Sequence, residues 1–252
     1  VGVLGDTVER IAWHKAGVAR PGAPLVTGAS GAALAVVERE AQALGAPVIR
    51  VPSGAGAVSH NRALAAEAAR QFTTGHGIAL DDGQVARGLD RVRLAGRSEV
   101  MHGDGPRVVL DGAHNPDKLR VAIDAALSGA GAGPKVAVVG ILRSKSGLDV
   151  AAPFAGRFDR VIATEPRVYG KPACPARETA TLFAGKGCRA EAIPDPLEAV
   201  SAAVARAGTD GTVLVTGSFY LIGEVRERWY AKEAVVALQT SFPHLEGKHS
   251  AK

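Results

Sequence analysis

One stretch near the middle of the chain constrains the fold more than any other. Residues 107–110 favour a strand, residues 111–115 are small or polar, and Pro116 opens a segment with apolar residues at helical spacing. Those apolar residues are Leu119, Ile123, Ala126 and Leu127. The pattern predicts a strand, a tight turn and a helix, with Pro116 near the first helical position and Asn115 as the N-cap.

The polar residues of this turn are Asp111, His114 and Asn115. They follow the carboxyl end of a strand, where open α/β sheets bind ligands, and the N–H groups of the next helix favour an anion there. A carboxylate, an imidazole and an amide could hold a ribose, a phosphate or a metal. The alternative is that Asp111 and Asn115 only cap the turn and that His114 only packs.

From Arg97 onward, apolar runs alternate with helical patterns. Further strands are expected at 135–140, 160–164, 188–193 and 212–216, with helices at 117–128, 147–156, 176–184 and 195–207. Five strands with crossover helices predict a doubly wound, Rossmann-like α/β sheet. No Gly-x-Gly-x-x-Gly fingerprint with an acidic residue downstream follows any of these strands, which disfavours a nicotinamide-dependent dehydrogenase.

The part of the chain before residue 94 also alternates strands with helices. Helices are expected at 7–17, 32–44, 61–72 and 81–89, and strands at 24–27 and 47–51. Gly17 and Gly45 end the first two helices, and Asp81 caps the last. An α/β fold therefore extends over nearly the whole chain.

Composition narrows the function classes. Aromatic residues make up only 4% of the 252 residues, so the core is expected to consist of Ala, Val and Leu. The net charge of +5 is modest and the arginines are scattered, which argues against a nucleic-acid surface. No apolar run is long enough to span a membrane. Two cysteines, Cys174 and Cys188, are too few for a disulfide scaffold, so the cytoplasm is the expected location.

Four ordered stretches resemble one known family. The sequence Asp-Gly-Ala-His-Asn-Pro at 111–116 is similar to the C-terminal-domain signature of the folylpolyglutamate synthase / dihydrofolate synthase family, a branch of the Mur ligase superfamily. The segment at 4–18 resembles the one that carries the family's carbamylated lysine. Residues 94–97 resemble its linker arginine motif, and residues 215–221 resemble its last core strand and the turn after it.

The resemblance implies a domain organisation. Residues 1–94 would be the C-terminal part of the family's central ATPase domain, residues 95–240 the Rossmann-like C-terminal domain, and residues 241–252 a tail. The family places an ATP-binding P-loop domain first, and no Gly-x-x-x-x-Gly-Lys-Ser/Thr sequence occurs in this chain. We therefore expect the chain to be a fragment that lacks this N-terminal P-loop domain and is inactive alone.

Lys15 is the first residue to which the resemblance gives a role. It shares a helix face with Val8 and Ile11, an unusual place for a lysine, and a desolvated lysine with a lowered pKa reacts readily with carbon dioxide. In the family this lysine is carbamylated, and the carbamate acts as an extra carboxylate near magnesium. The alternative is a half-exposed lysine without a role.

Arg97 is the second residue to which the resemblance gives a role. It follows Leu-Ala-Gly at the expected domain junction, and its guanidinium is a planar, permanently charged donor that suits phosphate. In the family the linker arginine reaches the nucleotide phosphates. A plain hinge arginine paired with Glu99 is the alternative.

Three residues at other strand ends are candidate ligands for glutamate or another anion. Lys145 lies where the family has an Asp-Lys-Asp turn, but Ser144 and Ser146 replace both acids, so the role of those acids is in doubt. Arg167 ends a turn similar to one in the family. Ser218 corresponds to a serine that the family places near the incoming glutamate. The alternative for each is a solvated loop residue.

The reaction implied by the resemblance is an ATP-dependent ligation. ATP would phosphorylate the carboxylate of a folate or dihydropteroate, and the amine of L-glutamate would displace the phosphate. Asp111 and His114 would hold the nucleotide, with Asn115 toward the adenosine. The catalytic residues would be Lys15, Asp111 and His114. Arg97, Lys145 and Mg²⁺ with the Lys15 carbamate would offset phosphate charge. A monomer is expected. A Mur peptidoglycan ligase and a non-catalytic Mur-like binding module are the alternatives.

Overall fold

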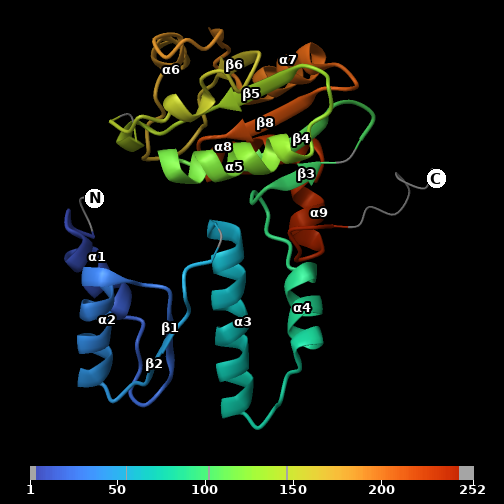
Figure 1. The fold of residues 1–252 in the computed structure, drawn as a ribbon. Helices are drawn as coiled ribbons and strands as arrows, with labels where there is room; N and C mark the ends of the chain where they lie inside the picture. Colours follow the sequence, from blue (N-terminus) through green and yellow to red (C-terminus); the bar gives the residue numbers. More distant parts are fainter. Residues whose placement is uncertain (1–3, 55, 102, 146, 244–252) are drawn as a thin grey trace. The chain divides into compact units, whose positions relative to one another are not determined.

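The computed structural model describes residues 4–54, 56–101, 103–145 and 147–243 (Figure 1). The chain divides into two compact units, Val1–Val92 and Arg93–Lys252. The boundary lies two residues before the junction expected from the sequence. Each unit is described by itself.

The first unit contains the six elements that the sequence predicted. They are α1 (Val8–Ala16), β1 (Leu25–Thr27), α2 (Gly31–Ala43), β2 (Val48–Arg50), α3 (Ala57–Gly75) and α4 (Asp82–Arg91). The strands β1 and β2 pair in parallel, and α3 begins four residues earlier than expected. Helix α4 begins with a capping box in which the Asp81 carboxylate accepts from Gln84 N at 2.7 Å and the Gln84 side chain accepts from Asp81 N at 2.9 Å.

Helix α1 buries a different face from the one expected. Its buried residues are Ala12 and Ala16, while Val8 and Lys15 are exposed. Helix α1 packs on α2, and small alanine side chains allow the two helices to approach closely. The expectation of a desolvated Lys15 is therefore wrong for this chain.

The second unit is built around a six-stranded sheet among the described residues. Its order is β3-β4-β8-β5-β6-β7, and only β3 runs antiparallel to its neighbour. The strands are β3 (Glu99–Met101), β4 (Arg107–Asp111), β5 (Lys135–Val139), β6 (Arg160–Ala163), β7 (Ala190–Ala192) and β8 (Thr212–Thr216). The helices are α5 (Pro116–Ser128), α6 (Ala176–Ala184), α7 (Pro196–Ala207), α8 (Phe219–Val225) and α9 (Lys232–Ala237).

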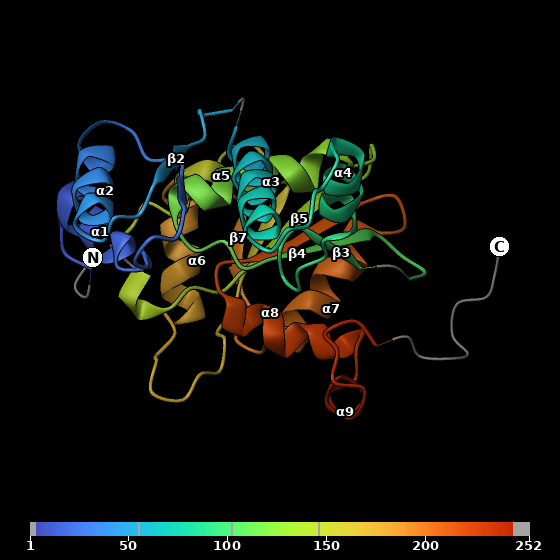
Figure 2. The same cartoon turned by 90° about the horizontal axis from the view of Figure 1, so that it is seen from below.

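Two hydrophobic layers cover this sheet. On one face, Val109, Ala137 and Leu214 pack with α5 and α6. On the other face, the alternate residues Leu110, Val138 and Val215 pack with α7 and α8 (Figures 1 and 2). Because successive residues of a strand point to opposite faces, strands buried on both sides read as continuous apolar runs. The predicted doubly wound α/β sheet is confirmed.

Several predicted elements were wrong in detail. The helix expected at 147–156 is only a short 3₁₀ turn, Ala152–Phe154, because Pro153 lacks a donor and glycines flank the segment. Strand β3 was missed, since three residues that begin with Glu99 show no strand pattern. Helices α8 and α9 were missed as well. At the start of the predicted tail, Ser241 and Phe242 contact Arg226.

Candidate functional site

The turns after β4 and β8 lie against each other at the carboxyl edge of the sheet. The Ala113 carbonyl accepts from Gly217 N at 2.9 Å and from Thr216 Oγ1 at 3.3 Å. In the ladder, Asp111 pairs with Thr216. This edge therefore carries the polar turn that the sequence singled out, supported by the neighbouring strand.

Asp111 is buried, with 6% of its surface exposed. Its Oδ2 accepts from Ser98 N at 2.8 Å and from Ser98 Oγ at 3.2 Å, and its Oδ1 accepts from Ala113 N at 2.8 Å. The resemblance assigned this carboxylate, at the carboxyl end of a strand, to the nucleotide as a ligand. The structure instead satisfies it internally, so Asp111 holds the turn and the linker together.

His114 and Asn115 are both half-buried, but their side chains make different hydrogen bonds. His114 Nδ1 lies 2.9 Å from the Gly112 carbonyl, so in the neutral ring Nδ1 is the donor and Nε2 is left for a ligand. The Asn115 side chain accepts from Lys118 N at 2.9 Å and caps α5, as predicted. His114 is thus the side chain of this turn best placed to contact a bound molecule.

Arg97 belongs to the same site because the linker is bound to the turn. Gly112 N donates to the Gly96 carbonyl at 2.9 Å, in addition to the contact between Ser98 and Asp111. The Arg97 guanidinium carbon lies 4.5 Å from the centre of the Phe219 ring. The expected alternative, a pair between Arg97 and Glu99, is wrong, since Glu99 pairs with Arg226.

Lys145 lies in the 3₁₀ turn Arg143–Lys145 after β5, at the same edge. Strand β8 separates β5 from β4, so the two turns begin about 10 Å apart. Lys145 is half-buried, and no ion pair joins it to another described residue. It remains a candidate anion ligand. Ser144 is exposed, and Ser146 lies outside the described residues.

Arg167 is bound by two carboxylates of its own unit. Its guanidinium pairs with Asp195 and, at 3.1 Å, with Glu224, and its backbone N donates to Glu224 at 3.1 Å. The pKa of Asp195 lies below its usual value, chiefly because Glu198 N donates to it and also because Arg167 is beside it. An incoming anion would have to displace these carboxylates, so the structure disfavours Arg167 as an anion ligand.

Ser218 is buried, with 4% of its surface exposed. Its hydroxyl accepts from Tyr220 N at 3.1 Å and caps α8. Local helix capping therefore accounts for this serine, and contact with glutamate would require it to be uncovered.

Lys15, on α1 of the first unit, is exposed. A carbamate on it would supply one carboxylate-like group, whereas magnesium needs several oxygen ligands in a fixed arrangement. Within the described residues, no group of three or more His, Cys, Asp or Glu side chains could hold a metal ion. The described residues therefore do not form a complete site for magnesium.

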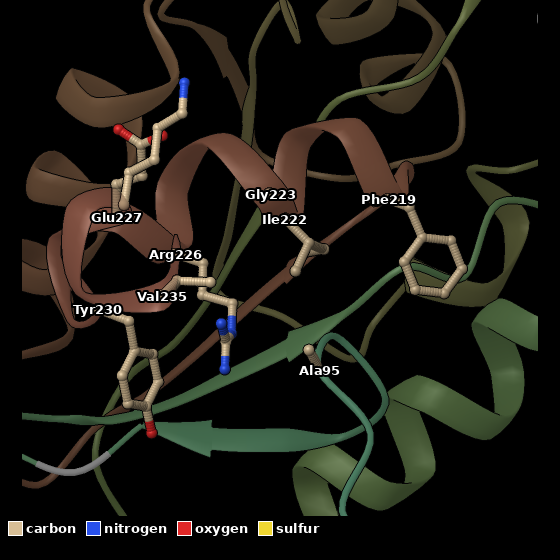
Figure 3. A pocket seen from close by; sticks show the side chains of 9 residues that line it. Ala95, Phe219, Ile222, Gly223, Arg226, Glu227, Tyr230 and Val235 are labelled. Atoms are coloured by element: carbon tan, nitrogen blue, oxygen red, sulfur yellow. The ribbon is translucent and has the colours of Figure 1, made fainter. Parts of the chain in front are cut away.

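A cavity of about 260 Å³ lies beside the linker in the second unit. It is lined by Ala95, by Phe219 and Ile222 of α8, and by Arg226 and Tyr230, among others (Figure 3). Figure 3 shows the Arg226 side chain pointing away from its own helix, toward the strands. The cavity thus borders the groups that hold the linker.

Comparison with known proteins agrees with this geometry. The family described as "Mur ligase, glutamate ligase domain" matches residues 96–219, which span the linker, the polar turn and the start of α8. A probable bifunctional folylpolyglutamate synthase/dihydropteroate synthase of Halobacterium salinarum is 34% identical over 98% of this chain. Residues 96–219 therefore form a glutamate ligase domain of the Mur ligase type, and the chain is homologous to folylpolyglutamate synthases.

Other relatives agree. The folylpolyglutamate synthase of Lacticaseibacillus casei is 28% identical over 89% of this chain. The structure of the Thermotoga maritima folylpolyglutamate synthase covers 90% of the chain with a TM-score of 0.67 and 25% identity. That of the Mycobacterium tuberculosis enzyme, complexed with ADP, covers 92% with a TM-score of 0.76 and 23% identity.

The chain spans only part of these relatives. It covers 34% of the Halobacterium protein, 58% of the Lacticaseibacillus enzyme, and 59% and 61% of the two solved chains. The described part of the chain contains no helix with an apolar stretch sufficient to span a membrane.

Sequence reasoning missed three residues of the site. Phe219 was noted only as part of a motif, and the partnership of Glu99 with Arg226 joins residues 127 positions apart. Aromatic residues are rare in this chain, so Phe219 in the Ser-Phe-Tyr sequence at 218–220 stands out, and this could have indicated it as a site residue. Nothing local marks the pairing of Glu99 with Arg226.

Proposed function

We propose that this chain is the glutamate-ligase portion of an ATP-dependent enzyme that adds L-glutamate to a folate. The observation that carries the proposal is the joining of Arg97 and His114 at one strand end, within the segment that matches the glutamate ligase domain. A fixed guanidinium and an imidazole at the start of a helix suit a phosphate-bearing substrate.

In the proposed reaction, a carboxylate oxygen of the folate attacks the γ-phosphorus of ATP, giving an acyl phosphate and ADP. The amine of L-glutamate then attacks the acyl carbon. The C–N bond forms, the bond to phosphate breaks, and the amine loses a proton. Arg97 and His114 would contact the nucleotide phosphates, and Lys145 a second anionic group of the substrates. Asn115 would lie toward the adenosine.

The remaining assignments are proposals of the same kind. Residues 1–94 would belong to a central ATPase domain and residues 95–240 to the ligase domain. A P-loop domain would complete the nucleotide site, and a carbamate on Lys15 would provide one ligand to Mg²⁺. We propose a cytoplasmic monomer, because the two cysteines, Cys174 and Cys188, are too few for a disulfide scaffold.

The experiment joins the chain in frame to the P-loop portion of the Lacticaseibacillus casei enzyme. With ATP, magnesium, L-glutamate and tetrahydrofolate, the fusion is expected to form ADP and glutamylated folate, and the chain alone neither. His114→Ala in the fusion is expected to lower turnover about a hundredfold, the cost of losing one preorganised polar contact. Exposed Lys118→Ala is the control.

Product formed by the chain alone would contradict the need for a P-loop partner. Unchanged turnover in His114→Ala would remove this turn from the active site. A fusion that ligates an amino acid to a peptidoglycan precursor but not to a folate would favour the Mur peptidoglycan branch.

A further inference from the structure

The linker that carries Arg97 is a tight turn with two left-handed residues. Arg97 N donates to the Leu94 carbonyl at 3.1 Å, and Gly96 has a φ of +66°. A Cβ on Gly96 would lie 2.9 Å from a methyl group of Ile222, so only glycine fits there. Ser98 has a φ of +44°, which is costly for a residue other than glycine. Such a turn persists only where its surroundings hold it.

Two carboxylates hold the backbone on either side of Arg97. Glu99 Oε2 accepts from Gly96 N at 2.8 Å, and Asp111 Oδ2 accepts from Ser98 N at 2.8 Å. Both carboxylates are buried, at 7% and 6% exposure. The residues before and after Arg97 are therefore fixed by charged acceptors, which make stronger hydrogen bonds than neutral ones.

Glu99 is in turn fixed by Arg226, which is 8% exposed. Arg226 Nη2 donates to Glu99 Oε1 at 2.8 Å, and Nε lies 3.0 Å from Oε2. The guanidinium also donates to the Ser241 carbonyl and lies 4.3 Å from the centre of the Tyr230 ring (Figure 3). This two-point geometry fixes both the position and the plane of the carboxylate.

Phe219 sets the direction of the Arg97 side chain. Its ring packs directly on Gly112, where an added Cβ would lie 2.5 Å from the ring, and the Arg97 guanidinium carbon lies 4.5 Å from the ring centre. Arg97 is exposed, and no hydrogen bond or ion pair joins its side chain to another described residue. Its donors are thus oriented by the ring and remain available to a ligand.

We propose that Glu99, Phe219 and Arg226 are positioning residues that hold Arg97 as a preoriented contact for the phosphates of the nucleotide. Arg226 and Glu99 fix the linker backbone, and Phe219 fixes the side chain. This inference rests on the function proposed above. It extends that function to three residues that touch no substrate.

The test compares Phe219→Leu with Phe219→Tyr in the 252-residue chain. NMR follows the Arg97 Nε–Hε signal, assigned by its loss in Arg97→Lys, and tripolyphosphate serves as the anion probe. In Phe219→Leu the ring-current shift of the Arg97 signal should disappear, and tripolyphosphate affinity should fall about threefold. Phe219→Tyr keeps the ring and should retain both. Tyr220→Leu, an equally exposed neighbour, should leave the Arg97 signal in place.

Arg226→Lys tests the backbone part of the proposal, because lysine keeps the charge and loses the two-point contact. It should move the Arg97 signal and weaken tripolyphosphate binding. An unmoved Arg97 signal in both Phe219→Leu and Arg226→Lys would overturn the proposal. If Arg97→Ala leaves tripolyphosphate binding unchanged, the proposed phosphate site fails, and the Arg97 signal alone then decides whether Phe219 and Arg226 position this side chain.

Discussion

Arg226→Ala is expected to lower the free energy of unfolding of the second unit by about 3–5 kcal/mol, the cost of leaving a buried charge unpaired. The variant removes every contact to the Glu99 carboxylate except that of Gly96 N, and it frees the Ser241 carbonyl. Urea unfolding followed by Trp229 fluorescence in a Trp13→Phe background measures this unit separately, because the chain has two tryptophans and each unit holds one.

Two further variants make this result specific. Exposed Arg228→Ala, two residues along the chain, should change the free energy of unfolding by no more than about 0.5 kcal/mol. The double variant Glu99→Gln/Arg226→Met removes both charges and keeps an acceptor for Gly96 N, so it should recover more than half of the loss. If the urea unfolding midpoint of Arg226→Ala equals that of the parent chain, the buried ion pair between Glu99 and Arg226 does not hold the linker.

Asp111→Ala is expected to cost about 3 kcal/mol of stability, because it leaves the buried N–H groups of Ser98 and Ala113 without their charged acceptor. It should also weaken nucleotide binding, since Ser98 adjoins Arg97.

His114→Ala should behave differently. The substitution removes one hydrogen bond within its own turn, so the free energy of unfolding should fall by about 1 kcal/mol or less. Nucleotide binding should nevertheless weaken.

The two variants separate a positioning role from direct contact. Stability comes from the urea midpoint and binding from titration with ADP at a temperature where both variants are folded. An Asp111→Ala chain as stable as the parent would contradict the internal role of this carboxylate. It would restore the view of Asp111 as an exposed ligand.

The sequence predicted most of the sheet because parallel strands buried on both faces leave a strong signal. Strands β4, β5 and β8 are apolar runs bounded by glycine or proline, and β6 is a shorter apolar run. Asn115 and Asp81 were found as N-caps because capping depends on residues close in the sequence. Short elements such as β3 were missed because a few residues carry no periodicity.

The site was predicted less completely because burial and pairing are not local properties. Asp111 was recognised as important, but its contact with Ser98 joins a strand to a linker thirteen residues away, so no local pattern indicates that the carboxylate is already hydrogen-bonded. Arg167 was proposed as an anion ligand because its turn resembles one in the family, and its partner Glu224 lies 57 residues further along the chain. Whether a cationic side chain can bind an anionic ligand depends on such partners.

The central claim is that the nucleotide phosphates bind at the turn after β4, against Arg97 and His114. The most direct test is a titration of the 252-residue chain with ADP, with the backbone amide signals assigned and followed by NMR. One side of a two-sided site should bind in the millimolar range, about −4 kcal/mol. The largest shifts are expected at residues 96–98 and 112–116, and Arg97→Ala and His114→Ala should each weaken them. Shifts centred instead on the opposite edge of the sheet, around Gly131 and Asp210, or no shifts at about 10 mM ADP, would contradict the claim.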